Sequence, residues 1–186
     1  MLSLNKQVVV VDYQSEWRQE FEVMKAFFRR NINIPNIQIE HIGSTSVEGL
    51  SAKPIIDIVI VVNSTKEFEK VKKDLENVEY THVGDQGIKN REVFKLTKPS
   101  NFYHHNLYVA LQGSLGLKNQ LTFRNHLRKH PEDVQRYGNL KKELAKRFSF
   151  DISSYIEGKT EFIISILQQY NFDENELMEI ININKK

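Results

Sequence analysis

The chain has 186 residues, of which 40% are hydrophobic and 27% are charged, and its formal net charge at pH 7 is +2. These proportions exclude a fibrous or intrinsically disordered protein, and they predict a soluble globular protein with a substantial core. The sequence contains no cysteine, which excludes disulfides, thiolate metal sites and cysteine nucleophiles. We therefore expect a protein of the reducing cytoplasm.

The charge balance and the apolar runs also limit the partners. A dedicated nucleic-acid-binding protein usually shows a denser basic face, so we expect a small-molecule partner and no nucleic acid. The opening residues 1–17 contain a short apolar run without a basic region before it or a small-residue cleavage site after it, so we expect no signal peptide. The longest apolar run is too short for a membrane span.

In the first half of the chain, strands and helices alternate. Residues 15–30 predict an amphipathic helix, because Trp17, Phe21 and Phe28 recur at helical spacing. Residues 37–42 alternate between apolar and polar side chains, which is typical of a half-buried strand. The remaining predicted elements are a strand at 7–11, a strand at 55–62 and a helix that starts at 63–65.

The second half becomes helical after a predicted hairpin. The hairpin joins strands 92–97 and 106–111 through residues 98–101. The helices that follow are expected at 117–128, from Pro131 to 148, at 153–170 and shortly after 173, and residues 180–186 are expected to form a frayed end or an edge strand. The predicted class is α+β (mixed α/β), with a core of residues 1–115 and a helical part of residues 116–186 packed on it as one unit.

The most informative stretch is residues 39–62. The turn Gly43-Ser44-Thr45-Ser46 follows a strand directly, so its amides and hydroxyls could line an anion site. Asp57 is the single charge on a strand that is otherwise apolar on both faces, which is costly unless the residue lies at an end or in a cleft. Lys53 lies between the two and could neutralise phosphate. Phosphoryl or nucleotidyl transfer needs a phosphate-binding turn beside a carboxylate that holds Mg²⁺. The alternative interpretation is an ordinary hydroxylated turn without a ligand.

The same stretch, IEHIGSTSVEGLSAKPIIDI, resembles the GrpB-like family of the nucleotidyltransferase superfamily. The likeness covers residues 7 to about 168 and includes YQSEW (13–17), YHHNLYV (103–109) and FRNHLRKHPE (123–132). It implies a nucleotidyltransferase-like fold, a mixed β-sheet flanked by helices with further helices at the C-terminal end. It also implies a nucleoside triphosphate as substrate or ligand, with Mg²⁺ held by Asp57. A similar module is fused to some dephospho-coenzyme A kinases.

The sequence departs from the superfamily pattern at the second acid. Active members typically place Asp-x-Asp or Asp-x-Glu on this strand, and here the second position is Val59. A third acid usually comes from a later strand, where this chain has His104, His105 and Asn106. Of the two histidines, His105 shares parity with the apolar Leu107, so we predict it as the second metal ligand, although imidazole is not a preferred ligand of Mg²⁺.

Other cations are candidates for phosphate contacts. Arg91 and Lys95 are four residues apart and share one strand face, and Arg124 is expected to face the cleft. The basic run 124–130 also fits a solvated helix face. His41 precedes the turn on the apolar face of its strand, so a buried, hydrogen-bonded histidine is the preferred interpretation over a ligand.

Two hypotheses follow. In the first, the protein binds a nucleotide or a phosphorylated small molecule and transfers a nucleotidyl group with Mg²⁺, with Asp57 as the catalytic carboxylate. In the second, the same fold serves as a non-catalytic nucleotide-binding or chaperone-like module. Val59 favours the second hypothesis, while Lys53 and Asp57 favour the first.

Overall fold

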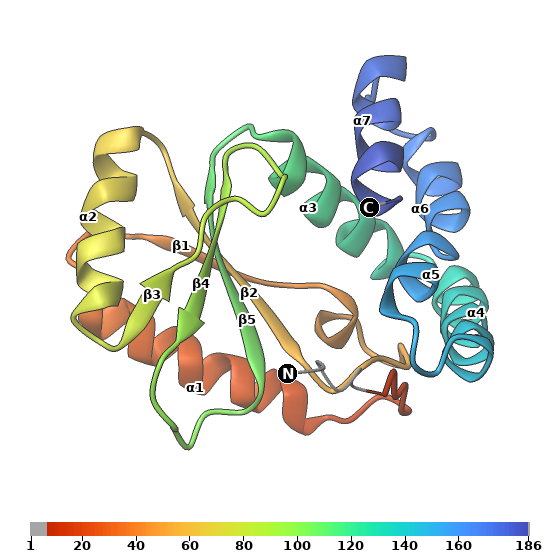
Figure 1. Ribbon diagram of the computed structural model, residues 1–186, viewed down its shortest axis with the longest axis horizontal. Helices are drawn as coiled ribbons and strands as arrows, with labels where there is room; N and C mark the ends of the chain where they lie inside the picture. Colours follow the sequence, from red (N-terminus) through yellow and green to blue (C-terminus); the bar gives the residue numbers. More distant parts are fainter. Residues whose placement is uncertain (1–6, 186) are drawn as a thin grey trace.

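The computed structural model describes residues 7–185, in which five strands form one mixed sheet (Figure 1). The strand order is β1-β2-β5-β4-β3. The central strands β2 and β5 are parallel, and the other three pairings are antiparallel. The strands are β1 (Gln38–Ile42), β2 (Ile56–Val62), β3 (Tyr80–His82), β4 (Arg91–Leu96) and β5 (His105–Leu111).

One face of the sheet is covered by α1 (Glu16–Asn31) and α2 (Thr65–Glu76). Their apolar stripes, which include Trp17, Phe21, Phe28 and Leu75, pack with alternate residues of β2 and β5 into the largest hydrophobic core. This confirms the α1 stripe that the helical spacing predicted. Ser64 caps α2 by accepting a hydrogen bond from the Glu67 amide, so the predicted helix start is also confirmed.

The other face meets α3 (Leu115–Leu127), whose Leu117 packs on Ile42, Val59 and Ala110. The helices that follow are α4 (Pro131–Arg147), α5 (Ile152–Glu157), α6 (Thr160–Leu167) and α7 (Glu174–Asn184). They gather beside one end of the sheet (Figure 1). The cleft between the second sheet face and these helices is lined by the predicted site residues Asp57 and Gly43.

Several predicted elements differ from the structure. Residues 7–11 form no strand beyond a single bridge of Val11 to Ala52, because Val8 instead packs on the C-terminal helices and bonds to the Ser149 carbonyl. The predicted helix 153–170 is divided into α5 and α6 around Gly158. The end of the chain was also predicted wrongly, since residues 180–184 continue α7 and only residue 186 lies outside the described part.

The sequence did not predict β3, which has only three residues and pairs with β4. The β4–β5 hairpin is confirmed, with Arg91 opposite Ala110 and Phe94 opposite Leu107. The start of α4 at Pro131 is confirmed as well. In residues 7–185 we find no helix with the length and apolar character needed to cross a membrane.

Candidate functional site

A cavity of about 290 Å³ lies between the second sheet face and the C-terminal helices. Its sheet side is lined by Gly43, Ser44, Asp57 and Tyr108, and its helix side includes Lys159 at the start of α6. Clefts of this kind, in which a few polar groups converge among apolar walls, are the usual place for a small ligand. The predicted turn and carboxylate therefore meet in one cavity.

Asp57 is held by the strand beside it. Parallel pairing of β2 with β5 sets Asp57 opposite Asn106, and Asn106 Nδ2 donates a hydrogen bond of 2.8 Å to Asp57 Oδ1. Burial raises the pKa of the Asp57 carboxyl, while the Asn106 hydrogen bond and the charges of Lys159, Lys53 and Arg91 act to lower it. The position of the expected third acid is thus filled by an amide that supports the carboxylate.

Gly43 brings the turn against this carboxylate. Its φ is +68° and its ψ is −174°, a conformation that is essentially restricted to glycine. A Cβ at this position would overlap Oδ2 of Asp57. The turn can therefore approach Asp57 only because residue 43 has no side chain.

Three cations act on the single carboxylate of Asp57 through their charge. Burial lowers the pKa of Lys159 to about 8, with Lys53 adding to the effect and Asp57 opposing it. Burial also lowers the pKa of Lys53 and of Arg91, and in both cases Asp57 opposes the shift. The Arg91 guanidinium lies 4.5 Å from the Tyr108 ring centre. Its Nε is buried and has no hydrogen-bond partner among the described residues. More positive than negative groups therefore act on Asp57, although only Lys159 among these three cations lines the cavity itself.

The three hydroxyls of the turn have different roles. Among residues 7–185, the Ser44 hydroxyl forms no hydrogen bond, and it lines the cavity. Thr45 is buried, and its Oγ1 donates to the Ile55 carbonyl and lies 3.0 Å from His41 Nε2. Ser46 Oγ donates to the Gly43 carbonyl within the turn. Of the predicted phosphate-binding hydroxyls, the structure leaves Ser44 available and engages the other two in holding the turn.

His105 does not meet Asp57. It follows the parity of Leu107 and Val109, which face α1 and α2, whereas Asp57 and Asn106 face α3. The His105 nitrogens lie 2.7 Å from Tyr80 Oη and 2.8 Å from the Tyr103 carbonyl. The prediction of a shared metal ion therefore has to be corrected, because the apolar parity that selected His105 placed it on the opposite face of the sheet.

Lys95 and Arg124, which were also predicted to contact phosphate, are placed differently from the cations that act on Asp57. Lys95 lies on the same strand as Arg91, but its side chain is exposed and makes no ion pair within the described residues. Arg124 is buried and lines the cavity, but its Nη1 already donates to Glu40 Oε2 over 2.7 Å and to the His41 carbonyl over 2.8 Å. This guanidinium ties α3 to β1.

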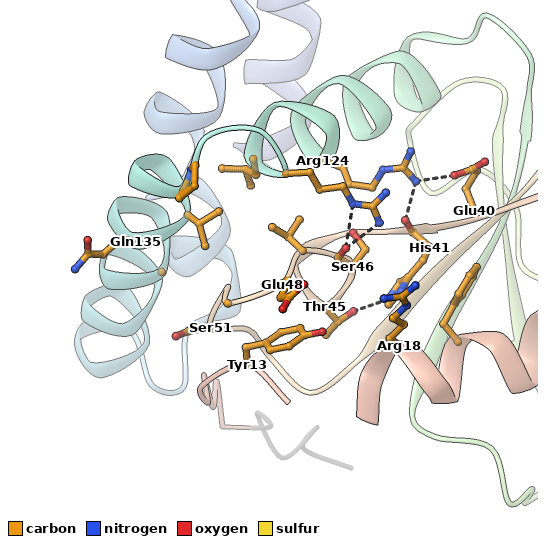
Figure 2. A pocket seen from close by; sticks show the side chains of 18 of the residues that line it. Tyr13, Arg18, Glu40, His41, Thr45, Ser46, Glu48, Ser51, Arg124 and Gln135 are labelled. Atoms are coloured by element: carbon orange, nitrogen blue, oxygen red, sulfur yellow. Dashed lines mark hydrogen bonds and ion pairs between the residues drawn. The ribbon is translucent and has the colours of Figure 1, made fainter. Parts of the chain in front are cut away.

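A second, larger cavity of about 870 Å³ lies on the other side of the turn (Figure 2). Figure 2 shows Arg18 of α1, Thr45 and Ser46 of the turn and Arg124 of α3 around it. His41 also lines it, stacked on Phe21 and buried at 6% exposure, as the sequence predicted. Burial, assisted by Arg128 and Arg124, lowers the pKa of His41 to about 3, so it is neutral at physiological pH. Arg124 and Leu127 line both cavities, so the turn and α3 form the wall between them.

Sequence reasoning missed Asn106, Tyr108 and Lys159 as site residues. Asn106 was noted only as part of the stretch where an acid was expected. Lys159 lies about a hundred residues after Asp57, in a short break between two helices, and no periodicity marks it. Its one sequence signal was its place within residues 7 to about 168, the region that resembles the GrpB-like family.

Solved structures with related folds show the fold class of this protein. The chain superposes with a TM-score of 0.57 on the Cid1 poly(U) polymerase bound to MgGTP, at 14% identity, covering 85% of this chain and 51% of that one. The GLD-2/RNP-8 complex matches with a TM-score of 0.54 at 14% identity, covering 88% of this chain and 63% of that one. The fold is therefore the α+β fold of nucleotidyltransferases, as the resemblance implied.

Within that class, the chain belongs to the GrpB protein family, whose profile matches residues 7–169. The conserved protein GrpB from Enterococcus faecalis superposes with a TM-score of 0.74 at 29% identity, covering 92% of this chain and 98% of that one. Glutamate-rich protein GrpB of Alkalihalophilus pseudofirmus is 33% identical over 91% of this chain and 99% of its own length. UPF0157 protein YqkA of Bacillus subtilis (strain 168) is 34% identical over 85% of this chain, which spans 46% of YqkA.

Proposed function

We propose that the cleft at Asp57 binds a nucleotide or another phosphorylated small molecule. The observation that supports this proposal is the charge balance, in which Lys159 lines the cavity with Asp57 while Lys53 and Arg91 also act on this one carboxylate, which is already hydrogen-bonded to Asn106. Buried like charges are costly unless they are compensated. An anionic ligand would supply the compensation that Asp57 alone does not.

The Ser44 hydroxyl suits a phosphate oxygen, because it lines the cavity and forms no hydrogen bond in the described part of the chain. Arg91 lines an adjoining pocket, which shares Asn119 and Gln120 with this cavity, and its buried Nε has no partner in the described part of the chain. A phosphate beside Lys159 would favour its ammonium form and reverse the effect of burial on its pKa. The cavity of about 290 Å³ is of the size of a small-molecule pocket, which favours a free nucleotide over a nucleic-acid strand.

The residues present do not fit the pair of Mg²⁺ ions used in metal-dependent nucleotidyl transfer. The second strand position, Val59, is 0% exposed and packs in the apolar layer under α3. Asn106 offers Asp57 an amide donor where a carboxylate ligand would be needed. Within residues 7–185, Asp57 also belongs to no group of three or more side chains placed to hold a metal ion. We therefore favour the binding module over the metal-dependent transferase.

A thermal-shift screen of the untagged chain tests this proposal. Nucleoside triphosphates and coenzyme A precursors are added with Mg²⁺ or with EDTA, and a bound ligand raises the melting temperature. We expect at least one phosphorylated compound to stabilise the protein in EDTA, and we expect Lys159→Met to remove that effect. Lys98→Met, which removes an exposed lysine of the β4–β5 connection, serves as the matched control and should retain it.

Two outcomes would contradict the proposal. If no phosphorylated compound changes the melting temperature, the cleft is not a phosphate site. If stabilisation requires both Mg²⁺ and the Asp57 carboxylate, the metal-dependent enzyme is the better description.

A further inference from the structure

The turn between α3 and α4 brings together three side chains of the kinds that bind transition metals. His126 lies in the last turn of α3, His130 directly precedes α4, and Asp133 lies in the first turn of α4. One potential ligand atom from each of the three lies within 4.8 Å of the others. We propose that His126, His130 and Asp133 bind one divalent first-row transition-metal ion, with Zn²⁺ as the best fit.

The chain geometry explains why these residues meet. His126 and His130 are four residues apart, so they share one side of the turn, and their rings stack with centres 4.1 Å apart. Pro131 then starts α4 and brings Asp133 back, so that its Oδ2 lies 2.8 Å from His126 Nε2. Ligand atoms about 2.0–2.1 Å from a tetrahedral Zn²⁺ stand roughly 3.3 Å from each other. Side-chain shifts of the order of 1 Å would therefore convert the present arrangement into a coordination site.

Each of the three candidate ligands has an outer contact, which for His130 is Glu132 Oε1, 3.1 Å from its Nδ1. His126 Nδ1 lies 2.9 Å from Tyr170 Oη, which leaves Nε2 directed at Asp133. Asp133 Oδ1 accepts a hydrogen bond of 2.9 Å from Arg136 Nη1, which leaves Oδ2 directed at His126. Metal-binding histidines and carboxylates commonly have such partners on their non-coordinating atoms, because these partners fix the ring and the carboxylate in place.

The ligand set and its exposure specify the kind of ion. Two imidazoles and one carboxylate suit Zn²⁺ and its first-row neighbours, whereas Mg²⁺ prefers oxygen ligands alone. The side chains of His126, Asp133 and His130 are 2%, 13% and 42% exposed, so the site is closed on one side and open to solvent at His130. Three protein ligands with an open side leave room for water as a fourth ligand.

A metal ion here would also brace the wall between the two cavities. The same end of α3 carries Arg124, which contacts Glu40 and the His41 carbonyl, and Arg128, which donates to the Ser46 carbonyl. Fixing α3 to α4 at this turn would hold both arginines against the Gly43–Ser46 turn. This inference is independent of the proposed phosphate site, because it uses none of the residues around Asp57.

The rival explanation is that His126 and Asp133 form only a buried hydrogen-bonded tie between the two helices. The two explanations differ at His130, which the tie does not need and the metal site does. Co²⁺ is a suitable probe, since its visible absorption increases strongly when it enters a tetrahedral site with protein ligands. The full chain without a histidine tag is treated with a chelator, dialysed and titrated with Co²⁺, and Zn²⁺ affinity is measured by competition with a coloured chelator.

We expect one equivalent of Co²⁺ per chain, displaced by one equivalent of Zn²⁺. His130→Ala, at a half-exposed position, should leave the protein folded by circular dichroism and weaken Zn²⁺ binding by more than about 100-fold. Tyr170→Phe removes only an outer partner and should weaken it by about 10-fold. The control His104→Ala removes an exposed histidine elsewhere and should have no effect.

The proposal is overturned if the chain binds no stoichiometric Co²⁺ or Zn²⁺, or if His130→Ala binds as tightly as the unmodified chain. It is also overturned if binding depends on Asp57 and not on His130, because the ion would then occupy the cleft.

Discussion

Asn106 Nδ2 donates a hydrogen bond of 2.8 Å to Oδ1 of Asp57, across the parallel pairing of the two central strands. An amide donor stabilises a carboxylate in its charged form without providing a further negative ligand for a metal. With Val59 buried two residues after Asp57, the centre of this sheet contains one carboxylate among several cations. This arrangement favours the binding of an anion over catalysis by two metal ions.

Asp57→Asn is expected to keep phosphate-ligand binding and to strengthen it. The change removes a negative charge that repels the ligand, and about 1 kcal/mol of repulsion corresponds to roughly fivefold in affinity. Isothermal titration calorimetry in EDTA, with the compound found by thermal shift, measures the effect. Glu69→Gln, at an exposed position of α2, is the charge-matched control and should not change the affinity. Loss of binding in Asp57→Asn would show that the carboxylate is itself a ligand contact or metal ligand.

Gly43→Ala is expected to lower the free energy of unfolding by about 2–4 kcal/mol. An alanine at this position would have to adopt a strained backbone conformation. Its Cβ would also overlap the Asp57 carboxylate. Urea denaturation measures the loss. Gly113→Ala is the matched control, since Gly113 also has a positive φ (+80°) but has no atom within 4 Å of an added Cβ. It should cost only about 1 kcal/mol. Equal losses would mean that the approach of the turn to Asp57 is not constrained by packing.

Lys159 should make the stability depend on pH between about 8 and 10. The lysine has an ordinary pKa of 10.5 and a pKa of about 8 in the folded protein, so the unfolded chain binds more protons in this window. Stability therefore rises with pH there, and the contribution of Lys159 should increase by about 2 kcal/mol between pH 7 and pH 9.5.

Urea denaturation of the unmodified chain and of Lys159→Met at both pH values isolates this contribution. The variant lacks the titrating group, so it should be more stable than the unmodified chain at pH 7, with a smaller difference at pH 9.5. A difference that does not change with pH would argue against a depressed pKa of Lys159. Saturating phosphate ligand should remove the pH dependence of the unmodified chain if the ligand binds beside Lys159.

Arg124→Ala is expected to lower the free energy of unfolding by about 2–4 kcal/mol. The substitution leaves Oε2 of Glu40 and the His41 carbonyl without their Arg124 donor, and the cost of breaking a largely buried pair exceeds that of an exposed one. In a double-mutant cycle with Glu40→Gln, the second change should recover part of the loss, because it removes the unpaired charge. Strict additivity of the two changes would show that the ion pair contributes little.

The fold was predictable where local pattern and burial agree. The apolar stripe of α1, which consists of Trp17, Phe21 and Phe28, can be buried only against a sheet face. The apolar run of β2 can be buried only where both of its faces are covered. The failures share a different cause. β3 is three residues long, the strand predicted at 7–11 found its contacts on the C-terminal helices, and the break at Gly158 depends on packing against Leu144. None of these contacts leaves a local signal.

The candidate site was predictable in part for the same reason. Gly43, Ser44, Lys53 and Asp57 are close in sequence and joined by one strand-turn-strand unit, so they can be recognised together. The choice of His105 failed because parity tells which residues share a face but not which face holds the cleft. Thr45 and Ser46 have the right chemistry for phosphate, yet their hydroxyls are used within the fold.

The sequence by itself determined the turn, the lone carboxylate with valine two positions later, and the main strands and helices other than β3 and the α5–α6 break, because these are properties of neighbouring residues. Only the tertiary structure decided what surrounds Asp57. Strand pairing set Asn106 beside it, and the helices brought Lys159 to it from about a hundred residues away. Charge balance in a cleft depends on distances between remote segments, and a linear sequence does not fix those distances until the chain has packed.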